Sequence, residues 1–141
     1  MPERFEVGYG LGPDLNVPGR MPVYRRRGGR PAETHVRVVE RFGRFVWVEV
    51  RPITSREMQV QAHLAAVGAP VLGDAVHGLA EVKLLLSQLK RVYKGREDER
   101  PMIDRLALHL SGLTVRHPLT KEPMTFTSPL PKAFEIALRN I

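Results

Sequence analysis

The sequence predicts an α+β domain with a mostly antiparallel, mixed sheet and a few flanking helices. Three observations lead to this class. Two β-branched and aromatic runs lie on either side of Gly43, a helix-start signal follows them at Thr54, and a proline suited to the first turn of a helix stands at residue 131. The chain of 141 residues is long enough for one such domain with a core, and too short for two.

The first 32 residues are rich in Gly, Pro and Arg and show no apolar periodicity. Because such a segment buries little surface by itself, we expect residues 1–32 to form an extended arm. The arm either lies on the remaining domain, residues 33–141, or is ordered by a ligand. Near its end is a basic cluster made up of Arg25, Arg26, Arg27 and Arg30. The cluster is interpreted either as a binding surface or as a solvated group of charges.

A β-hairpin is expected directly after the arm. Apolar and charged residues alternate over 34–42, and a second β-branched and aromatic run covers 45–50. Two such runs separated by a glycine, here Gly43, are typical of a hairpin. Trp47 lies in the second run. We expect it to be a core residue, and not a platform on which a base stacks.

A helix is predicted over residues 56–67. Thr54 or Ser55 can cap its first turn, and Glu57 lies near the positive end of the helix dipole. Gly68 is expected to end the helix, because glycine readily adopts the left-handed conformation that follows a last turn.

The second half of the chain predicts further elements with weaker patterns. The apolar run over 81–93 is compatible with a helix and with a buried strand, and this alternative stays open. The remaining expectations are a charged loop at 94–101, strands over 106–115 and 124–127 around a turn at 118–123, and a final helix over 131–139.

The charge of the chain makes a polyanion the first partner to consider. There are 22 Lys and Arg against 15 Asp and Glu, a net charge of +7 at pH 7, and basic surface gains free energy on phosphate backbones by releasing counterions. Most of the positive charges are arginines, which form bidentate contacts with phosphate and stack on bases. A coding bias toward GC explains the excess of arginine equally well.

Cysteine is absent from the sequence. This excludes disulfides, thiolate metal sites and a cysteine nucleophile. The start of the chain lacks the pattern of a secretory signal, and no apolar run approaches the length of a membrane span. We therefore expect a soluble, cytoplasmic protein without membrane contact.

Several strings, taken in order, resemble motifs of the RluA-type pseudouridine synthases, enzymes that isomerise uridine in ribosomal RNA or tRNA. The family pattern Val-Glu-(Val/Leu)-Arg-Pro-x-Thr-Gly-Arg-Thr-His-Gln-Ile-Arg-Val-His-Leu corresponds to residues 48–64, and its Gly-Asp-x-x-Tyr-Gly lies within 68–78. Further matches lie at 29–34, 39–42, 105–109 and 117–131. The resemblance covers nearly everything after residue 28 and implies the C-terminal half of the family's catalytic domain.

The resemblance also implies a chemistry that needs no metal or organic cofactor. In the family, an aspartate in an Arg-Leu-Asp-x-x-(Thr/Ser)-(Ser/Thr)-Gly motif attacks the flipped-out uridine. This sequence lacks that motif, and Asp74 matches the family's Gly-Asp turn instead. Gln61 stands where the family has the basic residue that neutralises the aspartate, and His77 replaces the motif tyrosine. No catalytic residue is therefore assigned, and the chain is expected to be inactive alone. The other aspartates are Asp14, Asp98 and Asp104.

The candidate binding residues follow from the charge pattern and from the resemblance. Arg56 and Gln59 match positions at the family's RNA cleft and are expected to face outward, and Gln61, at the position of the family's basic residue, is grouped with them. Together with the basic cluster they form the predicted RNA-binding set. His63 and His109 are expected to be packing and hydrogen-bonding residues. No metal site is expected, since His109 and His117 have no carboxylate or cysteine at ligand spacing.

These observations support more than one function. The first is a pseudouridine synthase domain for ribosomal RNA or tRNA that needs a complementing polypeptide, or a homo-oligomer, to be complete. The second is a non-catalytic RNA-binding or ribosome-assembly module. A relic without a selected function is the third.

Overall fold

The computed structural model describes residues 1–26, 28–78, 81–90 and 93–140. By its contacts the chain divides into two compact units, Met1–Val82 and Lys83–Ile141, and each is described by itself. The predicted arm 1–32 lies within the first unit, and Arg27 lies outside the described residues. The pairings among the described strands are antiparallel, so the predicted α+β class is confirmed.

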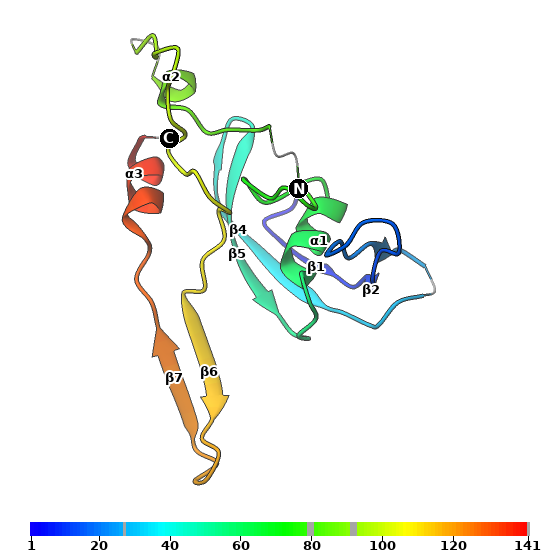
Figure 1. Cartoon of the computed structure of the whole chain (residues 1–141). Helices are drawn as coiled ribbons and strands as arrows, with labels where there is room; N and C mark the ends of the chain where they lie inside the picture. The colour runs from blue at the N-terminus through cyan, green and yellow to red at the C-terminus, as the bar shows by residue number, and fades with distance from the viewer. Residues whose placement is uncertain (27, 79–80, 91–92, 141) are drawn as a thin grey trace. The chain divides into compact units, whose positions relative to one another are not determined.

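The first unit is built on a three-stranded sheet in the order β1-β4-β5 (Figure 1). The central strand β4 (Thr34–Phe42) pairs with β5 (Phe45–Pro52) and with β1 (Arg4–Val7). The predicted hairpin is confirmed, and Gly43 in its turn has a φ of 56°, which favours glycine. Because β1 belongs to the predicted arm, that segment contributes a strand to the sheet.

A second pair of short strands follows β1. Strand β2 (Gly10–Leu11) pairs with β3 (Val23–Tyr24), and Leu11 also bridges to Arg30. Leu11 is 1% exposed and forms a buried cluster with Ala32 and Ala62. The Gly- and Pro-rich segment therefore reaches the core through a few apolar residues, although its sequence shows no periodicity.

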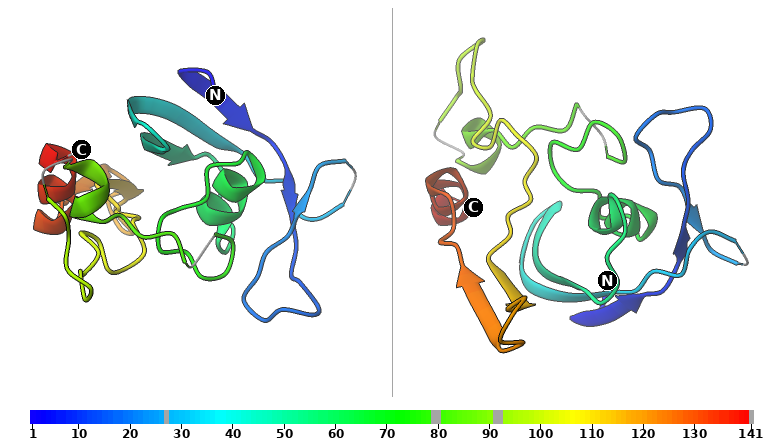
Figure 2. Two further views of the ribbon diagram at one scale, coloured as in Figure 1. Left: turned by 90° about the horizontal axis from the view of Figure 1, so that it is seen from above. Right: turned by 60° about the horizontal axis from the view of Figure 1, so that its bottom comes forward.

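Helix α1 (Gln59–Ala66) packs against one face of the β4–β5 hairpin, as both views of Figure 2 show. It begins three residues later than predicted, and neither Thr54 nor Ser55 caps it. Met58 occupies the cap position with a φ of 49° and no side-chain cap bond among the described residues. Gly68 follows the helix with a φ of 81°, as expected of a helix end.

The two faces of the sheet differ as strand alternation requires. Val36 and Val50 are register partners on the face toward α1, and Val36 is 3% exposed. On the other face Arg37 Nη2 lies 2.7 Å from Glu49 Oε1. The expectation that Trp47 belongs to the core is wrong: its position alternates with Val48, on the same face as Glu49, and it is exposed.

The described residues of the second unit form a β-hairpin and two helices. Strand β6 (Gly112–Arg116) pairs with β7 (Pro123–Thr127), and α3 (Lys132–Asn140) begins next to Pro131, close to the predicted position. The predicted strand 106–115 is reduced to its last part, because residues 106–111 have no pairing strand in the described chain. Within 81–93 the described residues form a single short helix, α2 (Leu86–Leu89).

No helix in the described residues is long and apolar enough to cross a membrane.

Candidate functional site

A network of hydrogen bonds surrounds the buried side chain of Gln59. Its Nε2 donates to the carbonyl of Glu33 and to Thr34 Oγ1, at 2.9 Å each. The Thr54 hydroxyl donates to Gln59 Oε1 at 2.9 Å and accepts the backbone N–H of Glu33. These bonds tie the start of β4, the turn after β5 and the start of α1 together, and they leave the amide group fully used.

The imidazole of His63 extends this network. Its Nδ1 lies 2.9 Å from Thr34 Oγ1, and its Nε2 lies 3.0 Å from the carbonyl of Tyr9. Because a carbonyl only accepts, the proton sits on Nε2, and Nδ1 accepts from the threonine hydroxyl. Burial lowers the pKa of His63 from its ordinary value of 6.5, and the bond to Tyr9 opposes this in part. His63 is thus a neutral residue inside the unit.

The expectation that Gln59 faces outward is wrong. Its side chain is 3% exposed and hydrogen-bonded on all sides, so it supports α1 and does not reach solvent. Sequence reasoning missed this because the late start of the helix turns Gln59 toward β4. Gln61, two residues further on, is partly exposed and makes no side-chain hydrogen bond in the described part of the chain.

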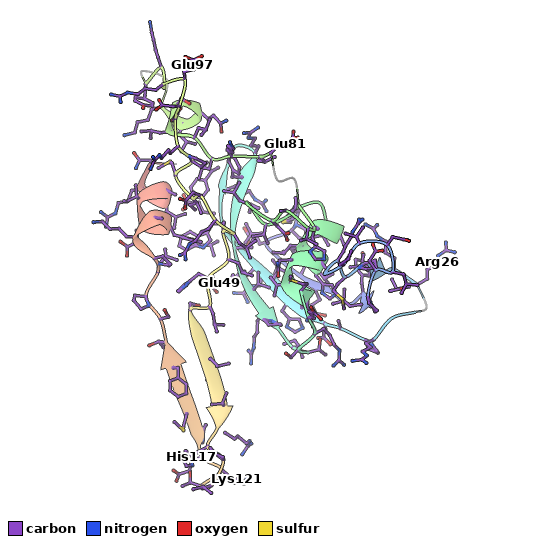
Figure 3. All side chains as sticks on the ribbon, viewed as in Figure 1. Arg26, Glu49, Glu81, Glu97, His117 and Lys121 are labelled. Atoms are coloured by element: carbon purple, nitrogen blue, oxygen red, sulfur yellow. The ribbon has the colours of Figure 1, made fainter. Side chains whose placement is uncertain are left out.

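Arginines gather directly after β3, in the basic turn, defined here as the described residues 24–26 and 28–30. Arg25 Nη2 donates to the carbonyl of Ala66 at 2.6 Å, at the C-terminus of α1, and its guanidinium lies 5.6 Å from the ring centre of Tyr9. Arg26 points away from the unit (Figure 3), and Arg26 and Arg30 are exposed. The structure therefore presents exposed cationic groups here, and Arg25 also bonds to the end of the helix.

Arg56 lies before α1 and is exposed, as predicted. Its Nε donates to the carbonyl of Pro31 at 3.2 Å, so it stands next to the segment that carries Arg30. Arg56 thus comes from a different stretch of sequence than Arg25 and Arg30, and it lies beside the end of the basic turn. Such a cationic surface can bind phosphate groups without further chemistry.

Asp74 and His77 form a buried pair that the sequence analysis did not predict. The backbone N–H of Met21 donates to His77 Nε2 at 3.0 Å, and Asp74 Oδ1 accepts the backbone N–H groups of Val76 and His77. This pair anchors the loop before β3 to the turn at 71–78. The Gly-Asp string predicts the turn itself, but no signal in the sequence places Met21 beside it.

The described residues contain one group of side chains that can meet around a metal ion: Glu6, Glu33 and His35. His35 Nε2 hydrogen-bonds Glu33 Oε1 at 2.6 Å and lies 3.7 Å from Glu6 Oε1. The two carboxylates are exposed. We interpret the group as a hydrogen-bonded surface patch, because exposed acidic side chains commonly gather in this way without a metal ion.

The histidines of the second unit are used within it. His109 Nε2 lies 3.2 Å from the carbonyl of Ser128, and its ring packs at a tilt on Phe134. His117 Nδ1 accepts the backbone N–H groups of Leu119 and Thr120 in the turn between β6 and β7. Both are therefore structural in this conformation.

The chain resembles known RNA-modifying proteins over nearly all of its length, although no protein-family model matches it. An uncharacterized RNA pseudouridine synthase of Chloroflexus aurantiacus is 33% identical over 140 residues, which are 99% of this chain and 38% of the relative. Ribosomal large subunit pseudouridine synthase D of Vibrio vulnificus is 36% identical over 106 residues, which are 73% and 30% of the two chains. The chain thus spans 38% and 30% of the length of these two curated relatives.

A solved structure has the same fold over the matched part. Human RNA pseudouridylate synthase domain containing 1 superposes with a TM-score of 0.66 at 26% sequence identity. The match covers 93% of this chain and 50% of the human one.

Proposed function

Because the chain is a homologue of RluA-type RNA pseudouridine synthases, matching them over part of their length, we propose that it is an RNA-binding protein of this type that does not isomerise uridine by itself. The homology confirms the resemblance found in the motifs.

The observation that carries the proposal is the residue at position 61. The family motif ends there in a basic residue, and this chain has Gln61. A neutral amide cannot hold a catalytic carboxylate by charge, and the chain lacks the family's nucleophile motif as well. The two losses are consistent with each other, because a buried arginine without its carboxylate is costly to retain.

The proposed partner is ribosomal RNA or tRNA, bound by the basic turn and Arg56. Support comes from the net charge of +7, from the exposed guanidinium groups, and from relatives whose names refer to the ribosomal large subunit. A role as a non-catalytic module in ribosome assembly is the alternative, since binding alone suffices for it. Gln59 is removed from the proposed interface because it is buried.

Tritium release from RNA labelled at C5 of uridine tests the catalytic part of the proposal. We expect release at the level of the blank with the purified chain. Measurable turnover by the purified chain contradicts the proposal, and a full-length homologous synthase is the positive control.

Filter binding to structured RNA across a salt series tests the binding part. The double variant Arg26→Ala/Arg30→Ala should weaken binding and reduce the salt slope by about 2, because each phosphate contact contributes about one counterion. Arg96→Ala/Arg100→Ala removes the same charge from an exposed loop of the second unit and is the matched control. No binding at low salt, or equal losses in the two double variants, contradicts this interface.

We further propose that catalysis in the cell requires a segment with the nucleophile motif, which a complementing polypeptide supplies. The native complex, isolated from source cells through a tag on this chain, should release tritium where the recombinant chain does not. If neither is active, the ribosome-assembly alternative is favoured.

A further inference from the structure

Tyr24 lies in the basic turn and has a large exposed surface. It follows Val23 in β3, and Val23 packs against the cluster of Leu11, Ala32 and Ala62. Because successive side chains in a strand point to opposite sides, Tyr24 points away from that cluster. It is 38% exposed, so more than a third of an aromatic side chain faces solvent in the most basic stretch of the chain.

The ring of Tyr24 rests on glycine backbone. A Cβ added to Gly28, Gly29 or Gly12 would come within 2.7, 2.8 and 3.1 Å of ring carbons of Tyr24. Gly28 and Gly29 also have φ values of 132° and 66°, which other residues rarely adopt. The turn therefore brings backbone directly against the ring, and these three residues have no side chain that covers it.

The same turn carries exposed charges close to Tyr24 in sequence. Arg25 is engaged with the carbonyl of Ala66 and with the ring of Tyr9, at 5.6 Å. Arg26 and Arg30, two residues and six residues after Tyr24, are exposed. An exposed aromatic ring with exposed guanidinium groups in the same turn is a combination that binds unpaired nucleotides: bases stack on the ring, and phosphates pair with the cations.

We propose that Tyr24 is a stacking platform for an unpaired base of RNA, with Arg26 and Arg30 contacting the neighbouring phosphates. The proposal rests on the proposed RNA binding and makes it specific: the RNA must present a single-stranded nucleotide at this turn. Double-stranded RNA keeps its bases inside the helix and cannot use the ring.

Binding measurements on two variants test the platform. Tyr24→Leu keeps an apolar side chain but removes the π-face, and should weaken binding to a single-stranded oligonucleotide about 5- to 150-fold, the range for losing one stacked base. Tyr24→Phe should retain the affinity. The salt slope should stay unchanged in both, because neither variant removes a phosphate contact. Binding to a blunt RNA duplex should be the same for all three proteins.

The possible outcomes distinguish a failure of the stacking platform from a failure of the proposed RNA binding. If wild type binds no RNA, the proposed function fails. If Arg26→Ala/Arg30→Ala weakens binding while Tyr24→Leu does not, the function stands and the platform is wrong. Equal losses of Tyr24→Leu on single-stranded and duplex RNA also contradict the platform, since they indicate a structural effect.

Photo-crosslinking of the unmodified chain keeps the test independent of how the leucine variant folds. RNA that carries 5-iodouridine in a single-stranded region should crosslink to the tryptic peptide 21–25, whose aromatic residue is Tyr24. A crosslink map of bound RNA without this peptide overturns the proposal.

Discussion

His77 and Asp74 form a buried pair in which His77 Nδ1 lies 3.7 Å from Asp74 Oδ2, and neither atom has a hydrogen-bond partner in the described part of the chain. The other ring nitrogen of His77 accepts the backbone N–H of Met21. A neutral imidazole that accepts at Nε2 carries its proton on Nδ1, which here faces the carboxylate. His63 has the opposite tautomer, with its proton on Nε2.

We predict that nitrogen–proton correlation spectra show His77 in the Nδ1–H form and His63 in the Nε2–H form. Asp74→Asn should disturb His77 alone. The asparagine oxygen keeps the backbone bonds of Val76 and His77, so its NH₂ group faces Nδ1 and favours the tautomer that cannot accept from Met21. The Met21 amide should then exchange faster with solvent. Asp98→Asn, in an exposed loop, is the control. An unchanged His77 tautomer in Asp74→Asn contradicts this assignment.

Gln59→Ala should lower the free energy of unfolding by about 1–3 kcal/mol, because it leaves the carbonyl of Glu33 and the Thr54 hydroxyl without their buried partner. Gln61→Ala removes the same side chain from the same helix where it is partly exposed, and should change stability by less than about 0.5 kcal/mol. Urea unfolding of the two variants measures the difference. Similar values for both would mean that the network around Gln59 does not stabilise the fold.

Acid should destabilise the first unit through His63. Burial lowers the pKa of this residue in the folded state below 6.5, so the unfolded chain takes up the proton first as the pH falls. The contribution is complete above pH 6.5 and is lost as the pH falls from there toward the folded pKa. Between pH 7.5 and 5.5, wild type should lose more stability than His63→Gln. Parallel pH profiles of the two proteins would exclude this role.

Gly29→Ala should be strongly destabilising. A Cβ at residue 29 would come within 2.8 Å of backbone atoms of Leu11, and the φ of 66° disfavours alanine in addition. We expect a loss of more than about 2 kcal/mol, since backbone cannot move aside as a side chain can. Gly8→Ala, where a Cβ meets nothing within 4 Å and φ is not positive, should be neutral within about 0.5 kcal/mol. Thermal melts of both variants check the contrast.

The local elements near Gly43 were predictable because their signals are local. Alternating side chains define β4 and β5, a glycine with positive φ joins them, and Gly68 ends α1. The predicted start of α1 is wrong because the Thr54 hydroxyl, which fits a helix cap, is hydrogen-bonded elsewhere. Thr54 bonds Glu33 and Gln59 instead, and the helix begins after Met58. Glu33, one of these two partners, lies 21 residues away in sequence, so the local pattern at Thr54 does not reveal it.

The candidate site divides in the same way. Its charge, its likeness to RNA pseudouridine synthases and the glutamine at position 61 are properties of the sequence alone, because they depend on which residues are present and in which order. Which of those residues meet solvent depends on contacts between distant segments. Only the tertiary structure buries Gln59 against β4, bonds Arg25 to the end of α1 and places glycine backbone against the Tyr24 ring. These contacts depend on how separate segments of the chain pack together, so local sequence patterns do not predict them.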